Sequence, residues 1–201
     1  MIMKIAVDVD GVLLNIIEKF CKLFNSKYKT NYTKKDIIQW EFYRDLNISE
    51  SEAYDIFYEI FRDVNISLED ENSVEILEQL NKNYYIDLVS ARDSQFKSNL
   101  VKNLENVNIR KDIHFNNIIM VKSHPYDVKL DYDYDIFIDD NPFLATAIQS
   151  FPKKVLLLYD QPWNQECRTG KNIYRVHDWK DIYMKLFMIK KYKKPLISEK
   201  V

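Results

Sequence analysis

Short apolar runs alternate with longer amphipathic segments along most of the chain. Six of the runs have the length and composition of buried strands in a parallel sheet. They cover residues 4–9, 84–89, 118–121, 134–138, 154–158 and 173–176. Three helical patterns lie between them, at residues 74–81, 95–104 and 142–151. Strands that alternate with helices predict an α/β fold with a Rossmann-like, doubly wound parallel sheet.

The segment between the first two predicted strands breaks this alternation. Residues 15–72 have no strand pattern, and helices are predicted there at 14–28, 36–43 and 49–61. Ser49 precedes the last of these helices and Glu52 follows three residues later, which is the pattern of a capping box. A helical insert after the first strand would lie above the carboxyl ends of the strands, where open α/β sheets bind ligands. We therefore predict a core domain of residues 1–14 and 73–201 and a small helical cap domain of residues 15–72.

Composition narrows the class of protein further. The chain has 201 residues, 46% of them hydrophobic, and a formal net charge of −2. This charge balance gives no basic field for a polynucleotide or a membrane surface. Cys21 and Cys167 lack CxxC or metal-ligand spacing and fit a reducing compartment. With no signal-peptide pattern, a cytoplasmic protein is expected. The basic stretch at 185–200 is interpreted as a solvated last helix and a frayed tail.

Carboxylates gather at the ends of two predicted strands. Asp8 and Asp10 end the first strand, where alternation would point both side chains the same way. Asp139 and Asp140 end the fourth strand, which can lie beside the first in a doubly wound sheet. Each pair alone could be an acidic turn that leads into a helix. Four carboxylates at one edge would repel one another unless a cation balanced them, so their joint placement favours a Mg²⁺ site.

Candidate phosphate-binding groups follow the second and third strands. Ser90 comes directly after the second apolar run, and its hydroxyl and the N–H groups of a following helix would make a phosphate cradle. Ser90 could equally cap a helix that begins near Asp93. Lys129 and Lys122 are both candidates for a cation that neutralises the phosphate. Spacing alone does not choose between the two lysines.

Four segments together resemble the ordered motifs of a known enzyme class. DVDGVL, the SAR after the second strand, Lys129 and IDDNP are similar to the motifs of the haloacid dehalogenase (HAD) superfamily of phosphatases. YDQPWN and RVHDW further resemble segments of the 5'(3')-deoxyribonucleotidase family. The resemblance covers the core nearly end to end. It implies a HAD-like fold and a Mg²⁺-dependent phosphate monoester hydrolase that works through an aspartyl-phosphate.

The resemblance also implies a role for each motif residue. Asp8 would be the nucleophile and Asp10 the general acid–base residue. Ser90, Ala91 and Lys129 would bind the substrate phosphate. The Mg²⁺ ligands would be Asp8, Asp10 (through its backbone carbonyl) and Asp140, with Asp139 in support.

The substrate implied by the resemblance is a small-molecule nucleoside monophosphate. Three alternatives stay open: another phosphometabolite, the terminal phosphate of a polynucleotide, or a non-catalytic binding protein with the same fold. Trp40, Phe42 and Tyr43 could stack on a nucleobase, but their spacing fits the core of the cap better. A homodimer is compatible with the sequence, and no membrane or polynucleotide partner is expected.

Overall fold

The computed structural model describes residues 2–193, which contain one six-stranded sheet. All neighbouring strands are parallel, in the order β3-β2-β1-β4-β5-β6. The strands are β1 (Lys4–Val7), β2 (Tyr85–Ser90), β3 (Asn117–Met120), β4 (Ile136–Asp139), β5 (Val155–Tyr159) and β6 (Ile173–Val176). All six predicted strands are confirmed, and so is the doubly wound α/β fold.

The same residues, 2–193, contain six α-helices. They are α1 (Ile16–Tyr28), α2 (Glu50–Arg62), α3 (Ser73–Asn81), α4 (Lys97–Asn106), α5 (Pro142–Ala147) and α6 (Trp179–Lys193). The predicted capping box at the start of α2 is present, since Ser49 Oγ accepts from Glu52 N and Glu52 accepts from Ser49 N. Among the helices described, none is long and apolar enough to cross a membrane. The predicted tail beyond residue 193 lies outside the described residues.

The two faces of the sheet bury different side chains. Ile5 and Val7 of β1 belong to a cluster with apolar residues of α3, α4 and α6. Ala6 and Phe137 point the other way and pack with Leu144 of α5. Helices therefore cover both faces, as strand alternation in a buried parallel sheet requires.

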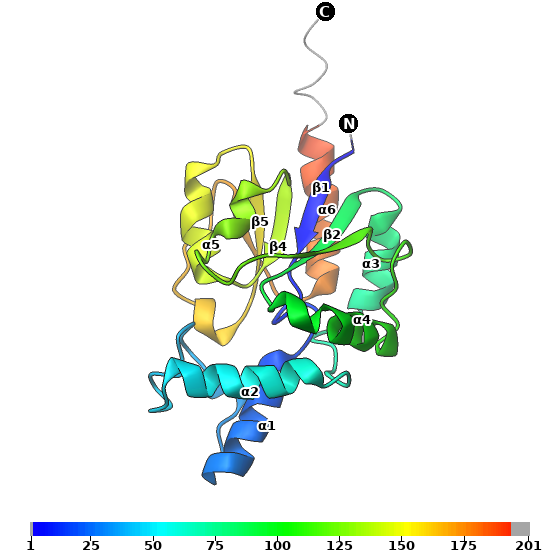
Figure 1. Cartoon of the computed structure of the whole chain (residues 1–201). Helices are drawn as coiled ribbons and strands as arrows, with labels where there is room; N and C mark the ends of the chain where they lie inside the picture. Colours follow the sequence, from blue (N-terminus) through cyan, green and yellow to red (C-terminus); the bar gives the residue numbers. More distant parts are fainter. Residues whose placement is uncertain (1, 194–201) are drawn as a thin grey trace, which may run out of the picture.

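Helices α1 and α2 lie beyond the carboxyl ends of the strands, where the cap was predicted (Figure 1). Their buried aromatics, including Phe20 and Phe24, belong to the same apolar cluster as Ile5 and Val7. The apolar core thus continues from the sheet into the helical insert. The domain limits, residues 15–72 for the cap and residues 1–14 and 73–201 for the core, stay a prediction.

The helix predicted at 36–43 is wrong. A short 3₁₀ helix, η1 (Lys34–Asp36), ends where that helix was predicted to begin, and turns follow as far as Asn47. The buried apolar residues of the segment, Ile37 and Phe42, are five positions apart. Such positions lie about 140° apart around an α-helix, so one helical face could not bury both. Ile38 follows Ile37 directly, but its exposed fraction is 61%, so it would not have added to a buried face of such a helix.

Candidate active site

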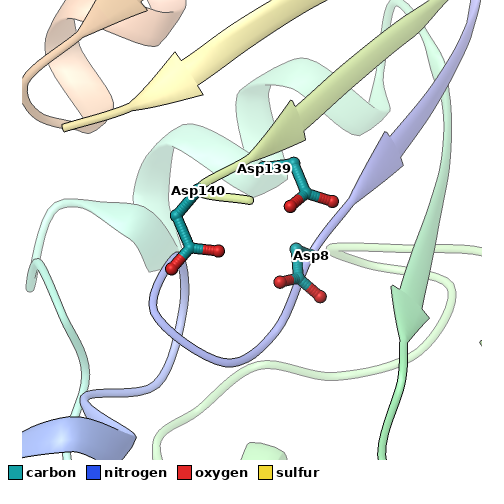
Figure 2. A group of neighbouring side chains, drawn as sticks. All are labelled: Asp8, Asp139 and Asp140. Carbon is teal, nitrogen blue, oxygen red and sulfur yellow. The ribbon is translucent and has the colours of Figure 1, made fainter. Parts of the chain in front are cut away.

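Three carboxylates converge where β1 and β4 end. Asp8 follows β1, and Asp139 and Asp140 lie at the end of β4. One oxygen from each lies within 4.8 Å of the others, and Figure 2 shows the three side chains gathered from the two neighbouring strands. All three are buried, with exposed fractions of 8%, 1% and 2%. The parallel pairing of β1 with β4 therefore creates a dense negative charge inside the protein.

Lys129 is the cation that balances this charge. Its Nζ lies 2.8 Å from Asp8 Oδ1 and 2.7 Å from Asp139 Oδ2. It projects from η3 (Val128–Asp131), a 3₁₀ turn just before β4, and its exposed fraction is 5%. Lys122 is exposed and lines the same cavity without joining the carboxylates. Of the two candidate lysines, the structure thus places Lys129 at the predicted position.

Burial and mutual repulsion perturb the ionisation of this group. Burial, opposed by Lys129, raises the pKa of Asp8 to about 7. Burial and the charges of Asp8 and Asp139 raise the pKa of Asp140 well above its usual value. Burial would lower the pKa of Lys129, but the charges of Asp139 and Asp8 outweigh it and raise that pKa. A further positive charge is therefore electrostatically favoured here.

Asp140 is only partly satisfied by the protein. Its Oδ2 accepts a hydrogen bond from Trp163 Nε1 at 3.1 Å. Its Oδ1 is buried and has no hydrogen-bond partner among residues 2–193. A Cβ on Gly11, whose φ is +84°, would lie 2.3 Å from Asp140 Oδ2, so only glycine leaves room here. A buried oxygen that accepts no hydrogen bond, next to two more carboxylates, is a suitable ligand for a hard divalent cation such as Mg²⁺.

Asp10 does not join the other three carboxylates, contrary to the expectation that four converge. Its side chain pairs with Arg92, which donates from Nε to Oδ2 at 2.8 Å and from Nη2 to Oδ1 at 2.5 Å. The physical reason is that β1 ends at Val7, so strand alternation no longer orients Asp10. Sequence reasoning missed Arg92 as a site residue. The only available signal was its position in the SAR segment.

Ser90 is the last residue of β2 and Ala91 follows it; of the two, Ala91 is among the residues that line the cavity. Ser90 is fully buried, and its Oγ accepts from Arg92 N at 3.2 Å. Asp93, not Ser90, caps the following turn, because its side chain accepts from Gln95 N.

A cavity of about 700 Å³ opens above these residues. Asp8, Asp10, Lys129, Asp139 and Asp140 line it from the sheet edge. Aromatic side chains from the helical insert line it from the opposite direction: Trp40, Phe42, Tyr43, Tyr54, Phe57, Tyr58 and Phe61. Phe42 is buried, as expected for a core residue, whereas Trp40 and Tyr43 are half-buried. The site is thus an acidic floor under aromatic walls.

Solved structures with the same architecture identify the fold. A haloacid dehalogenase-like family protein from Streptococcus pneumoniae superposes with a TM-score of 0.63, at 15% identity over 92% of this chain and 98% of that one. L-2-haloacid dehalogenase from Xanthobacter autotrophicus gives 0.60 at 11% identity, over 93% and 99%. The sheet order and the insert after β1 place the chain in the class of proteins with the HAD fold.

Within this class the chain belongs to the family described as 5' nucleotidase, deoxy (pyrimidine), cytosolic type C protein, whose model matches residues 1–192. It is 26% identical to a nucleotidase of Clostridium acetobutylicum over 187 residues, which cover 90% of this chain and 92% of the relative. It is 25% identical to the 5'(3')-deoxyribonucleotidase of Bacillus subtilis over 182 residues, 90% of this chain and 97% of the relative. The predicted family resemblance is confirmed, and the protein is an enzyme of a nucleotidase family.

Proposed function

We propose that this enzyme is a Mg²⁺-dependent 5'(3')-deoxyribonucleotidase that hydrolyses the phosphate monoester of (deoxy)nucleoside monophosphates through an aspartyl-phosphate on Asp8. The observation that carries the proposal is the placement of Asp8 on the cavity floor, with Lys129 Nζ 2.8 Å from its Oδ1 and oxygens of Asp139 and Asp140 within 4.8 Å. This arrangement presents a nucleophile, a cation and an acidic metal-binding group to one bound phosphate.

Asp8, Asp140 and the backbone carbonyl of Asp10 would hold the Mg²⁺, with Asp139 in support. When bound, the ion supplies positive charge that draws the phosphate toward Asp8 and offsets the repulsion between two anions. Oδ1 of Asp140, which has no hydrogen-bond partner within the described part of the chain, supports this assignment, because a buried carboxylate oxygen without a partner is costly.

The protein residues divide the chemistry among them. A carboxylate oxygen of Asp8 attacks phosphorus, and the bond from phosphorus to the leaving alcohol oxygen breaks. Asp10 gives that oxygen a proton, then takes one from the water that cleaves the aspartyl-phosphate. Ser90, Lys129 and the backbone N–H groups near Ala91 stabilise negative charge on the phosphate oxygens.

The cavity supports a nucleotide as the substrate. Its volume of about 700 Å³ lies within the range of small-molecule sites. Trp40 and Tyr43 give its walls flat apolar faces, which suit a nucleobase as well as the packing of the cap. The names of the Clostridium and Bacillus relatives point to the same substrate class.

The test is phosphate release from a panel of deoxyribo- and ribonucleoside monophosphates and an aryl phosphate, with Mg²⁺ or EDTA. We expect Mg²⁺-dependent release that favours deoxynucleotides. Asp8→Asn should remove all turnover, whereas Asp55→Asn, at an exposed position on α2, should leave it unchanged. Wild-type-like activity in purified Asp8→Asn would refute the aspartyl-phosphate. Release from the aryl phosphate but from no nucleotide would refute the substrate class.

A further inference from the structure

Arg92 is the buried cation of the site that the proposed chemistry does not use. Its side chain has an exposed fraction of 0%, and it lines the cavity. Two of its nitrogens donate to the two oxygens of Asp10, at 2.8 and 2.5 Å. Its remaining nitrogen, Nη1, has no hydrogen-bond partner in the described part of the chain. Both charge-assisted hydrogen bonds of this buried guanidinium go to the single carboxylate of Asp10, and this pairing calls for a functional explanation.

The paired bonds fix the orientation of the Asp10 side chain. A guanidinium is planar and rigid, and two parallel bonds leave a carboxylate little freedom to rotate. Asp10 is not sealed off, because its side chain is 22% exposed and it lines the cavity. Each carboxylate oxygen has two acceptor positions, so Asp10 can hold Arg92 and still present an oxygen to the cavity.

The guanidinium itself is braced by the helical insert. Its Cζ lies 4.7 Å from the centre of the Phe61 ring, near the end of α2. Phe61 is buried and stacks on Phe57, which also lines the cavity. A cation over an aromatic face is attracted to it, most strongly away from water. Arg92 thus joins Asp10, at the sheet edge, to an aromatic wall of the cavity.

We propose that Arg92 is a positioning residue, which holds Asp10 in the orientation for proton transfer to the leaving alcohol and takes its own position from Phe61. This inference rests on the proposed function, because it assigns Asp10 the acid–base role. It predicts a selective defect. Loss of Arg92 should slow the reaction of substrates whose leaving group must be protonated and spare those whose leaving group departs without a proton.

The experiment measures alcohol release in the first turnover of the full-length enzyme with Mg²⁺. The first turnover isolates transfer of the phosphoryl group to Asp8 from the later hydrolysis. A deoxynucleoside monophosphate has a leaving group that needs a proton, and 4-nitrophenyl phosphate has one that does not. For Arg92→Lys we expect a loss of about 10²-fold with the nucleotide, the usual cost of a misplaced group, and little change with the aryl ester.

If Arg92→Lys folds poorly, Phe61→Leu tests the same positioning role. Phe61→Leu keeps an apolar side chain but removes the ring, so it should show the same selectivity with a smaller loss. Arg62→Lys is the matched control, because Arg62 also lies over an aromatic ring, 5.6 Å from the centre of Phe96, but is exposed and outside the cavity. It should behave as wild type with both substrates.

The outcomes separate this inference from the proposed function. Equal losses of Arg92→Lys on both substrates, or no loss on either, would overturn the positioning role. Asp10→Asn should show the selective defect in a stronger form. If Asp10→Asn is selective and Arg92→Lys is not, only the inference fails. If Asp10→Asn is not selective either, the acid–base assignment of Asp10 fails, and the inference fails with it.

Discussion

Lys129 allows the electrostatics of the site to be tested without substrate. Its ammonium contacts Asp8 and Asp139 at 2.8 and 2.7 Å, and the three side chains are exposed by only 6%, 10% and 2%. Lys129→Met keeps the length of the side chain and removes its charge. Removing one partner of a buried ion pair costs about 3–5 kcal/mol, because the other charges stay buried without compensation. The apo protein should lose that much of its free energy of unfolding.

Such a loss is large enough to measure by thermal unfolding. Domains of this size lose about 2–4 °C of melting temperature per kcal/mol. Without metal we therefore expect Lys129→Met to melt about 6–20 °C below wild type. Mg²⁺ at the acidic group would replace the missing charge, and a ligand at about 100 times its Kd adds about 2.7 kcal/mol. The rise in melting temperature from EDTA to Mg²⁺ should therefore be larger for Lys129→Met than for wild type.

The control is Lys154→Met. Lys154 is half-buried, and its Nζ donates to the backbone carbonyl of Tyr132 rather than to a carboxylate of the acidic group. Its response to Mg²⁺ should match that of wild type. Two results would refute the idea that Lys129 and Mg²⁺ balance the same negative charge. In one, Lys129→Met melts at the wild-type temperature in EDTA. In the other, its melting temperature lies below that of wild type by the same amount with and without Mg²⁺.

Two further predictions concern Asp140. Gly11→Ala should lower the free energy of unfolding in urea by more than Gly170→Ala, because both glycines have positive φ but only the added Cβ at Gly11 would meet Asp140 Oδ2; equal losses would show that this contact does not matter. Trp163→Phe removes the hydrogen bond to Asp140 and should weaken Mg²⁺ binding by about 10–100-fold in calorimetry, since partners of metal ligands tune affinity by that much; unchanged affinity would exclude this role for Trp163.

The sheet could be predicted from sequence because its signal is local. Each strand is a short apolar run, and burial on both faces removes ambiguity about which side is polar. The meeting of the carboxylates could be predicted once β1 and β4 were recognised, because parallel strands have their carboxyl ends at the same edge of the sheet. Asp8, Asp139 and Asp140 therefore came together as expected.

The parts that could not be predicted depend on distant contacts. The η3 turn buries Lys129, whereas Lys122 stays exposed. No local sequence pattern predicts that turn, so the sequence could not choose between the two lysines. Arg92 is buried because Asp10 and Phe61 meet it from two remote segments. The turns after Asp36 replaced a helix because the protein buries both Ile37 and Phe42, which could not share one face of an α-helix.

The central place of β1 also has a consequence for how the enzyme is made. The strand that precedes Asp8 is synthesised before both of its partners, Tyr85–Ser90 on one side and Ile136–Asp139 on the other. Pairings between segments so far apart in sequence form late and slowly, since a long loop must close before any contact compensates. During synthesis, Asp8 can contact Lys129, Asp139 and Asp140 only after the segment through β4 has emerged from the ribosome. A chain that stops before β4 would carry Asp8 on an apolar strand with one unpaired edge, which favours aggregation over activity.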